Sequence, residues 1–218
     1  MPLQLTPAGV VVPGDRERAE LARAWNDDLS VRLPGFLHPQ LIRKLHARLG
    51  GGASWQVHLQ NLTEGQSSEL ELEDGVTRGL LTALFHDRHL WDAVRGITGC
   101  DPIQSFHGRI YRMDPGAHED VWHTDVNGQY MVALSLNLTA HPFTGGELHL
   151  RESGTRRMRV QIANTGQGDA IMFRIEDGLE HIVTSVTGTV PKVAWAGWFH
   201  RERLLPELDR LAGLRPAW

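Results

Sequence analysis

The chain changes character after Cys100, and this change constrains the fold more than any other feature of the sequence. Between residues 101 and 200, short alternating or apolar stretches are separated by Gly, Pro and Asn, as expected of strands joined by turns. The predicted strands cover residues 102–113, 129–138, 147–151, 156–162, 169–174, 182–186 and 190–199. So many short strands in about a hundred residues predict a β-sandwich or jelly roll.

The first hundred residues carry patterns typical of helices. Apolar residues recur every three to four positions and so lie on one face of each expected helix. The expected helices cover residues 15–28 and 39–49 and, in two pieces, 76–99; a short strand is expected over 29–33. The polar stretch 53–74 is predicted to be mostly loop, with its acidic residues Glu69, Glu71, Glu73 and Asp74 on a solvated face.

No internal repeat or linker divides the chain, and we therefore expect one domain over residues 1–218. Within it, residues 1–100 are expected to form a helical support region, 101–200 the jelly-roll core with the active site, and 201–218 a C-terminal tail. The predicted fold class is mostly β with flanking helices (α+β), in which the N-terminal helices buttress one outer face of the β-structure.

Charge and cysteine usage narrow the class of protein. The chain has 22 basic and 26 acidic residues, interleaved and with a net charge of -4, so nucleic acid is not favoured as a partner. Its single cysteine, Cys100, cannot form an intramolecular disulfide, which fits a reducing cytoplasm. No apolar run approaches the ~20 residues of a membrane helix, and residues 1–12 lack the pattern of a secretion signal. We expect a cytoplasmic protein without a membrane partner; the oligomeric state stays open.

Twelve histidines are a high count and give the first hint of metal chemistry. His123 and Asp125 are two positions apart, and such residues project from the same face of an extended strand. His181 opens a later strand-like stretch. Two imidazoles and one carboxylate form a facial triad with open coordination positions, which suits non-heme Fe(II) oxygenases; Zn(II) would accept the same ligands but gain nothing from those positions. A rival match at residues 118–120 shows that a His-x-Asp pattern alone is weak.

In this context the sequence resembles the Fe(II)- and 2-oxoglutarate-dependent oxygenases, and among them the prolyl 4-hydroxylase-like branch. The resemblance covers about residues 29–200. It rests on Tyr-Arg-Met-Asp-Pro-Gly (111–116), His-Thr-Asp (123–125), Ser-Leu-Asn (135–137), Gly-Gly-Glu-Leu (145–148), Gly-Asp-Ala-Ile-Met-Phe (168–173), His181, and Lys192 ahead of Val-Ala-Trp-Ala-Gly-Trp-Phe. It implies a double-stranded β-helix, a distorted jelly roll, with His123, Asp125 and His181 as iron ligands.

The resemblance also implies that 2-oxoglutarate chelates the iron through its keto oxygen and C1 carboxylate, while its C5 carboxylate needs a buried cation. Lys192 is the candidate, because an unpaired ammonium group is costly in a Val/Ala/Trp strand and a bound dicarboxylate would relieve that cost. In the family the basic residue follows the distal His by roughly nine or ten positions. In this sequence the separation between His181 and Lys192 is longer. A bulge or longer turn at residues 187–189 is therefore expected; the alternative is an edge-strand lysine that reaches water.

The alternation of side chains along a strand indicates which other residues line the expected pocket. Ser135 and Asn137 share one strand face, and Ser135 stands where relatives often place a Tyr that touches the C5 carboxylate. Trp198 lies on the same side of the last strand as Lys192, and Tyr111 is the second aromatic candidate. For both aromatic residues, core packing is the alternative. The predicted cofactor-binding residues are therefore Lys192, Ser135, Tyr111, Asn137 and Trp198.

Three functions stay open on these grounds. The first is a non-heme Fe(II)- and 2-oxoglutarate-dependent dioxygenase that hydroxylates a C–H bond of an amino-acid-like, peptidyl or other small-molecule substrate. It would use O2, decarboxylate 2-oxoglutarate to succinate and CO2, and have ascorbate as a candidate reductant. The second is a cupin-like metal-dependent isomerase or hydrolase, and the third is a non-enzymatic β-sandwich binding module. Substrate specificity is expected in residues 53–74, 114–122 and 126–129, which carry no readable code.

Overall fold

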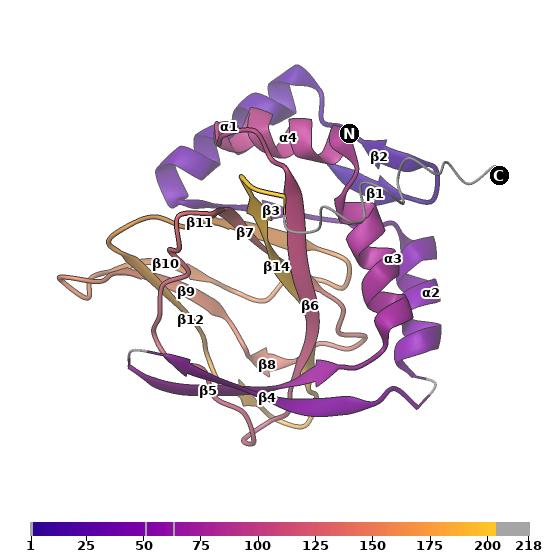
Figure 1. The fold of residues 1–218 in the computed structure, drawn as a ribbon, viewed down its shortest axis with the longest axis vertical. Helices are drawn as coiled ribbons and strands as arrows, with labels where there is room; N and C mark the ends of the chain where they lie inside the picture. Colours follow the sequence, from indigo (N-terminus) through magenta and orange to yellow (C-terminus); the bar gives the residue numbers. More distant parts are fainter. Residues whose placement is uncertain (1, 51, 63, 204–218) are drawn as a thin grey trace.

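The computed structural model describes residues 2–50, 52–62 and 64–203. Its largest element is an antiparallel sheet with the strand order β3-β11-β7-β14-β6-β5-β4 (Figure 1). The strands of this large sheet are β3 (Ser30–Leu33), β4 (Trp55–Leu62), β5 (Gly65–Leu72), β6 (Ser105–Met113), β7 (Tyr130–Asn137), β11 (Ala170–Arg174) and β14 (Lys192–His200). Strands from both halves of the chain thus contribute to one sheet.

A smaller sheet packs against one face of the large sheet. It has the order β10-β9-β12, and a separate pair joins β8 to β13. The bounds are β8 (Thr144–Gly145), β9 (Leu148–Glu152), β10 (Met158–Ile162), β12 (Leu179–Val183) and β13 (Val186–Thr187). Ala133 and Phe173 of the large sheet share a buried cluster with Leu150 and Leu179 of the small one. These two layers form the jelly roll that the sequence predicts.

The helices cover the opposite face of the large sheet (Figure 1). They are α1 (Asp15–Asp28), α2 (Pro39–Leu49), α3 (Gly75–Phe85) and α4 (Arg88–Thr98), preceded by a hairpin of β1 (Gln4–Thr6) and β2 (Gly9–Val11). Phe85 at the end of α3 packs against Phe106 and Trp195, with ring centroids 4.5 Å and 5.9 Å away. Alternate residues of β14 therefore face the helices, and those between them face the small sheet.

The predicted helices and the short strand at residues 29–33 are confirmed, but the prediction of loop over residues 53–74 is wrong. That stretch forms the hairpin of β4 and β5, which extends the large sheet beyond β6. Polar residues alternate with apolar ones on β4, yet Val57 is 65% and Leu59 is 55% exposed, so the apolar face is not the buried one. An alternating pattern marks a strand even where its polar face borders a pocket.

Two further expectations are corrected or limited by the structure. The strand predicted over residues 182–186 starts earlier, as β12, and breaks after Val183 before the short β13. Residues 204–218 of the predicted tail lie outside the described residues. None of the helices in the described ranges combines the length and the apolar character that crossing a lipid bilayer requires.

Candidate active site

The structure brings three predicted residues from distant points of the chain together. One donor atom each of His123, Asp125 and His181 can be chosen so that all lie within 4.8 Å of one another. His123 Nε2 is 3.8 Å from one Asp125 carboxylate oxygen, and His181 Nε2 is 3.4 Å from the other. The backbones of the two histidines also pair as an isolated antiparallel bridge. This donor set of two imidazoles and a carboxylate fits a divalent metal such as Fe(II).

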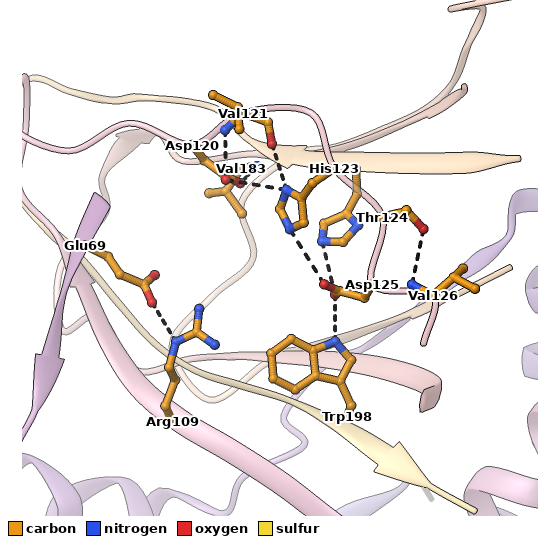
Figure 2. A network of polar contacts seen from close by, with 11 residues as sticks. Glu69, Arg109, Asp120, Val121, His123, Thr124, Asp125, Val126, Val183 and Trp198 are labelled. Carbon is orange, nitrogen blue, oxygen red and sulfur yellow. Dashed lines mark hydrogen bonds and ion pairs between the residues drawn. The ribbon is translucent and has the colours of Figure 1, made fainter. Parts of the chain in front are cut away.

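Asp120 and Val121 hold His123 in place from the preceding loop (Figure 2). The Asp120 carboxylate accepts the backbone N–H groups of Val121 and of Val183, each at 2.8 Å, and so fastens this loop to β12. His123 Nδ1 lies 2.7 Å from the Val121 carbonyl oxygen, which can only accept a hydrogen bond. The proton of the neutral ring is therefore on Nδ1, and Nε2 keeps a free lone pair that points to Asp125.

Asp125 is oriented by an aromatic residue of the last strand. Trp198 Nε1 donates a hydrogen bond of 2.7 Å to Asp125 Oδ2 (Figure 2). The indole ring is itself fixed by stacking on Tyr130, with centroids 4.9 Å apart and planes 13° from parallel. Such a partner holds a ligating carboxylate in one orientation. Trp198 thus contacts the triad itself in addition to walling the pocket.

Burial prepares His181 for metal binding. The side chain is 11% exposed and packs against the Phe173 ring, with centroids 5.0 Å apart. Loss of water around the ring, with the neighbouring His123, holds the pKa of His181 below its usual range, although Asp125 acts in the opposite direction. The ring is therefore neutral at pH 7, which is the form that binds a metal ion.

Lys192, the first residue of β14, lies in the same pocket. Its side chain is buried, its Nζ donates to the Gly146 carbonyl oxygen at 2.7 Å, and it lies 5.8 Å from the Tyr111 ring centroid. Burial lowers the pKa of Lys192 to about 8, while the charges of Asp120 and Glu69 act to raise it. The chain reaches Lys192 through a bend at residues 188–189. The ammonium group thus faces the pocket and not bulk water.

Three other predicted cofactor-binding residues, Tyr111, Ser135 and Asn137, border the same pocket. Tyr111 of β6 is buried and shares a side-chain hydrogen bond with Ser135 of β7, and burial raises its pKa so that it keeps its hydroxyl proton. Asn137 also borders the pocket, but its amide donates to the carbonyl oxygens of Thr165 and Gly166. The Asn137 side chain therefore holds the loop before β11.

One pocket is bordered by every one of these predicted residues. They are Tyr111, His123, Asp125, Ser135, Asn137, His181, Lys192 and Trp198. The rival histidine His118 has another role, because its Nδ1 accepts the backbone N–H of Asp114.

Sequence reasoning missed a charged pair in the pocket, Arg109 and Glu69. The Arg109 Nε donates to Glu69 Oε1 at 2.6 Å, and both residues border the pocket (Figure 2). Glu69 was expected on a solvated face, but its side chain is only 14% exposed because β5 pairs with β6. The signal was present in the alternation of residues 69–73, where acidic residues occupy every second position around two leucines.

Fold and site together define a metal-dependent oxygenase built on a jelly roll. Residues 108–200 match the model of the 2OG-Fe(II) oxygenase superfamily. This match includes the triad and Lys192, and together with the metal donor set it supports an oxidoreductase of the dioxygenase type that uses Fe(II), 2-oxoglutarate and O2. No curated protein matches the sequence.

Solved structures share the fold at low sequence identity. A 2OG-Fe(II) oxygenase family protein from Burkholderia pseudomallei aligns with a TM-score of 0.66 and 16% identity, covering 88% of this chain and 95% of its own. A Pseudomonas putida prolyl-4-hydroxylase gives a TM-score of 0.55 at 16% identity, and the alignment covers 88% of this chain and 98% of the hydroxylase. A Trichoplax adhaerens prolyl hydroxylase was solved with a hypoxia inducible factor peptide fragment. It gives a TM-score of 0.60 at 13% identity, and the alignment covers 85% of this chain and 89% of the hydroxylase. The fold is the double-stranded β-helix of these oxygenases.

Proposed function

We propose that this protein is a hydroxylase in which His123, Asp125 and His181 bind Fe(II) and Lys192 binds the C5 carboxylate of 2-oxoglutarate. The observation that carries the proposal is that three metal donor atoms and a buried ammonium group border one pocket. When bound, iron and cosubstrate supply oxygen activation, with decarboxylation of 2-oxoglutarate to succinate and CO2 and transfer of one oxygen atom to a C–H bond.

The side chains of this pocket bind and orient the reactants. Trp198 and the Val121 carbonyl oxygen hold Asp125 and His123 in single orientations, so metal binding costs little rearrangement. Lys192 and the neutral Tyr111 hydroxyl offer a cation and a donor to the distal carboxylate. Phe173 and Ala133 supply apolar walls that limit water around the reacting atoms.

The substrate class of the proposal is an amino-acid-like, peptidyl or other small molecule. Support comes from the prolyl hydroxylases among the structural relatives, one of them solved with a peptide fragment. Ascorbate is proposed as a reductant, and the cytoplasm as the place of action. The cupin-like alternative required a lysine that faces away from the metal site, whereas Lys192 borders the same pocket. The binding-module alternative treats the histidines as incidental, whereas His123 and His181 lie together with Asp125.

The test measures succinate formed from 2-oxoglutarate with Fe(II) and ascorbate, under air and under nitrogen. We expect turnover in the wild type only under air and with iron. His123→Ala and Asp125→Ala should reduce it to background, because each removes one donor of the triad. His149→Ala is the matched control, because His149 lies on β9 outside the pocket and contacts Glu147. Succinate formation by the triad variants at the wild-type rate would refute the proposal.

A further inference from the structure

The pocket contains a second cation that the proposed iron and cosubstrate sites do not use. Arg109 on β6 pairs with Glu69 on β5, and their side chains are 22% and 14% exposed. Across β14, Arg109 stands opposite Ala196, whereas Lys192 stands opposite Met113. Four residues of strand, about 13 Å, separate the two registers. The two cations therefore start from different points along the pocket.

Arg109 lies beside the triad. Its guanidinium carbon is 5.7 Å from the ring centroid of Trp198, the residue whose Nε1 donates to Asp125. In Figure 2 the terminal nitrogens of Arg109 point into the space between Glu69, Trp198 and the triad. A group bound to these nitrogens would lie one indole ring away from Asp125, within reach of the proposed reaction centre.

The pairing with Glu69 orients Arg109 without exhausting its donors. A guanidinium group carries five N–H donors, and in the part of the chain that the structure describes only Nε makes a hydrogen bond, to Glu69. Because Glu69 already fixes the side chain, little further rotamer entropy is lost when a ligand binds. The outward fork of terminal N–H groups matches the two oxygens of a carboxylate.

We propose that Arg109, held by Glu69, binds a carboxylate group of the substrate, so that the enzyme acts on a small carboxylic acid such as a free amino acid. This inference rests on the proposed function and narrows its substrate class. An internal residue of a peptide has no free α-carboxylate, so it would offer no such group to the terminal N–H donors of Arg109, which stays paired with Glu69.

The test measures binding to the enzyme loaded with Fe(II) and 2-oxoglutarate under nitrogen, so that no turnover occurs. The probes are the proteinogenic L-amino acids and simple carboxylic acids from acetate to benzoate, each compared with its amide by calorimetry. We expect one or more acids to bind at least tenfold more tightly than the matching amide. Arg109→Gln should weaken the binding of that acid by about 10- to 100-fold and remove the preference for the acid over the amide.

Two variants control for structure and charge. Arg112→Gln changes a neighbouring arginine that pairs with Asp114 and does not border the pocket, and it should keep the preference for the acid. Arg109→Lys keeps the charge but loses the fork, and it should bind the acid with intermediate affinity. Thermal unfolding of each variant shows that the chain is folded.

Two results would overturn the inference. One is that no acid of the panel binds more tightly than its amide. The other is that Arg109→Gln weakens binding of 2-oxoglutarate instead, which would place Arg109 in the cosubstrate site. Failure of the proposed function looks different, because the wild type would then show no iron-dependent binding of 2-oxoglutarate, a measurement that does not involve Arg109.

Discussion

At the scale of single residues, burial of the Lys192 ammonium group costs free energy. The position of this group in the pocket explains why the fold keeps it there. The buried ammonium group is near a carbonyl oxygen and an aromatic ring, and no carboxylate of the described residues contacts it. The negative charges that act on it, Asp120 and Glu69, reduce the effect of burial on its pKa without cancelling it. A protein keeps such a group at a functional site more often than in a purely structural core, and an incoming dicarboxylate would compensate the lost hydration.

The lowered pKa of Lys192 predicts how cosubstrate binding depends on pH. With a pKa of about 8, Lys192 is mostly charged at pH 7 and becomes neutral as the pH rises above 8. Tyr111 stays neutral over this range because burial raises its pKa. The Kd for 2-oxoglutarate, measured by anaerobic titration, should therefore rise about tenfold per pH unit above pH 8.

Lys192→Arg tests the origin of this dependence, because a guanidinium group stays charged at all these pH values. We expect the arginine variant to lose the rise in Kd between pH 8 and pH 9.5. A wild-type Kd that stays constant from pH 7 to pH 9.5 would contradict the assignment of Lys192 to the cosubstrate.

At the scale of elements, the site depends on the register between β6 and β14. This pairing sets Arg109 opposite Ala196 and Tyr111 opposite Ala194. The two strands approach closely where Gly108 faces Gly197, and a Cβ on Gly197 would collide with the His107 carbonyl oxygen. Glycine at this position thus lets the central strands pair without a bulge, which keeps the pocket residues on one face.

Gly197→Ala should lower the free energy of unfolding by about 1–3 kcal/mol or more, because the backbone of β6 must move to admit the methyl group. Denaturant unfolding of the ligand-free protein measures the effect. Gly154→Ala is the control, since a Cβ there meets no atom within 4 Å, and it should stay within about 0.5 kcal/mol of the wild type. Equal stability of the two variants would show that β6 and β14 tolerate a wider spacing.

At the scale of the whole molecule, the proposed ligands would connect both β-layers. The triad joins the loop before β7 to β12 of the small sheet, while Lys192 and Tyr111 belong to the large sheet. Ligands that bind only the folded chain stabilise it by mass action. Metal and cosubstrate together should therefore stabilise the jelly roll as a unit.

Mn(II) and 2-oxoglutarate under nitrogen should raise the Tm by about 10–20 °C when each is present at about 100 times its Kd, because each ligand adds about 2.7 kcal/mol. Differential scanning calorimetry measures the shift, and a chelator should reverse it. Asp125→Ala removes a triad donor and should abolish most of the shift. An equal shift in this variant would mean that the metal binds elsewhere.

Much of this molecule could be predicted from local patterns in the sequence. Strand and helix periodicity located most elements, because side chains that alternate or recur every three to four positions must share a buried face. The residue types at 123, 125 and 181 indicated a metal site, and the resemblance to the 2-oxoglutarate-dependent oxygenases implied a role for Lys192 in cosubstrate binding. All four border one pocket.

Only the tertiary structure decided which partners those residues have. Glu69 reaches Arg109 because β5 adds to the edge of the large sheet, and Trp198 reaches Asp125 across the pocket. Asp120 likewise fastens its loop to a strand far along the chain. No local periodicity specifies these pairings, because they depend on which strands become neighbours, and strand order is set by the packing of the whole chain.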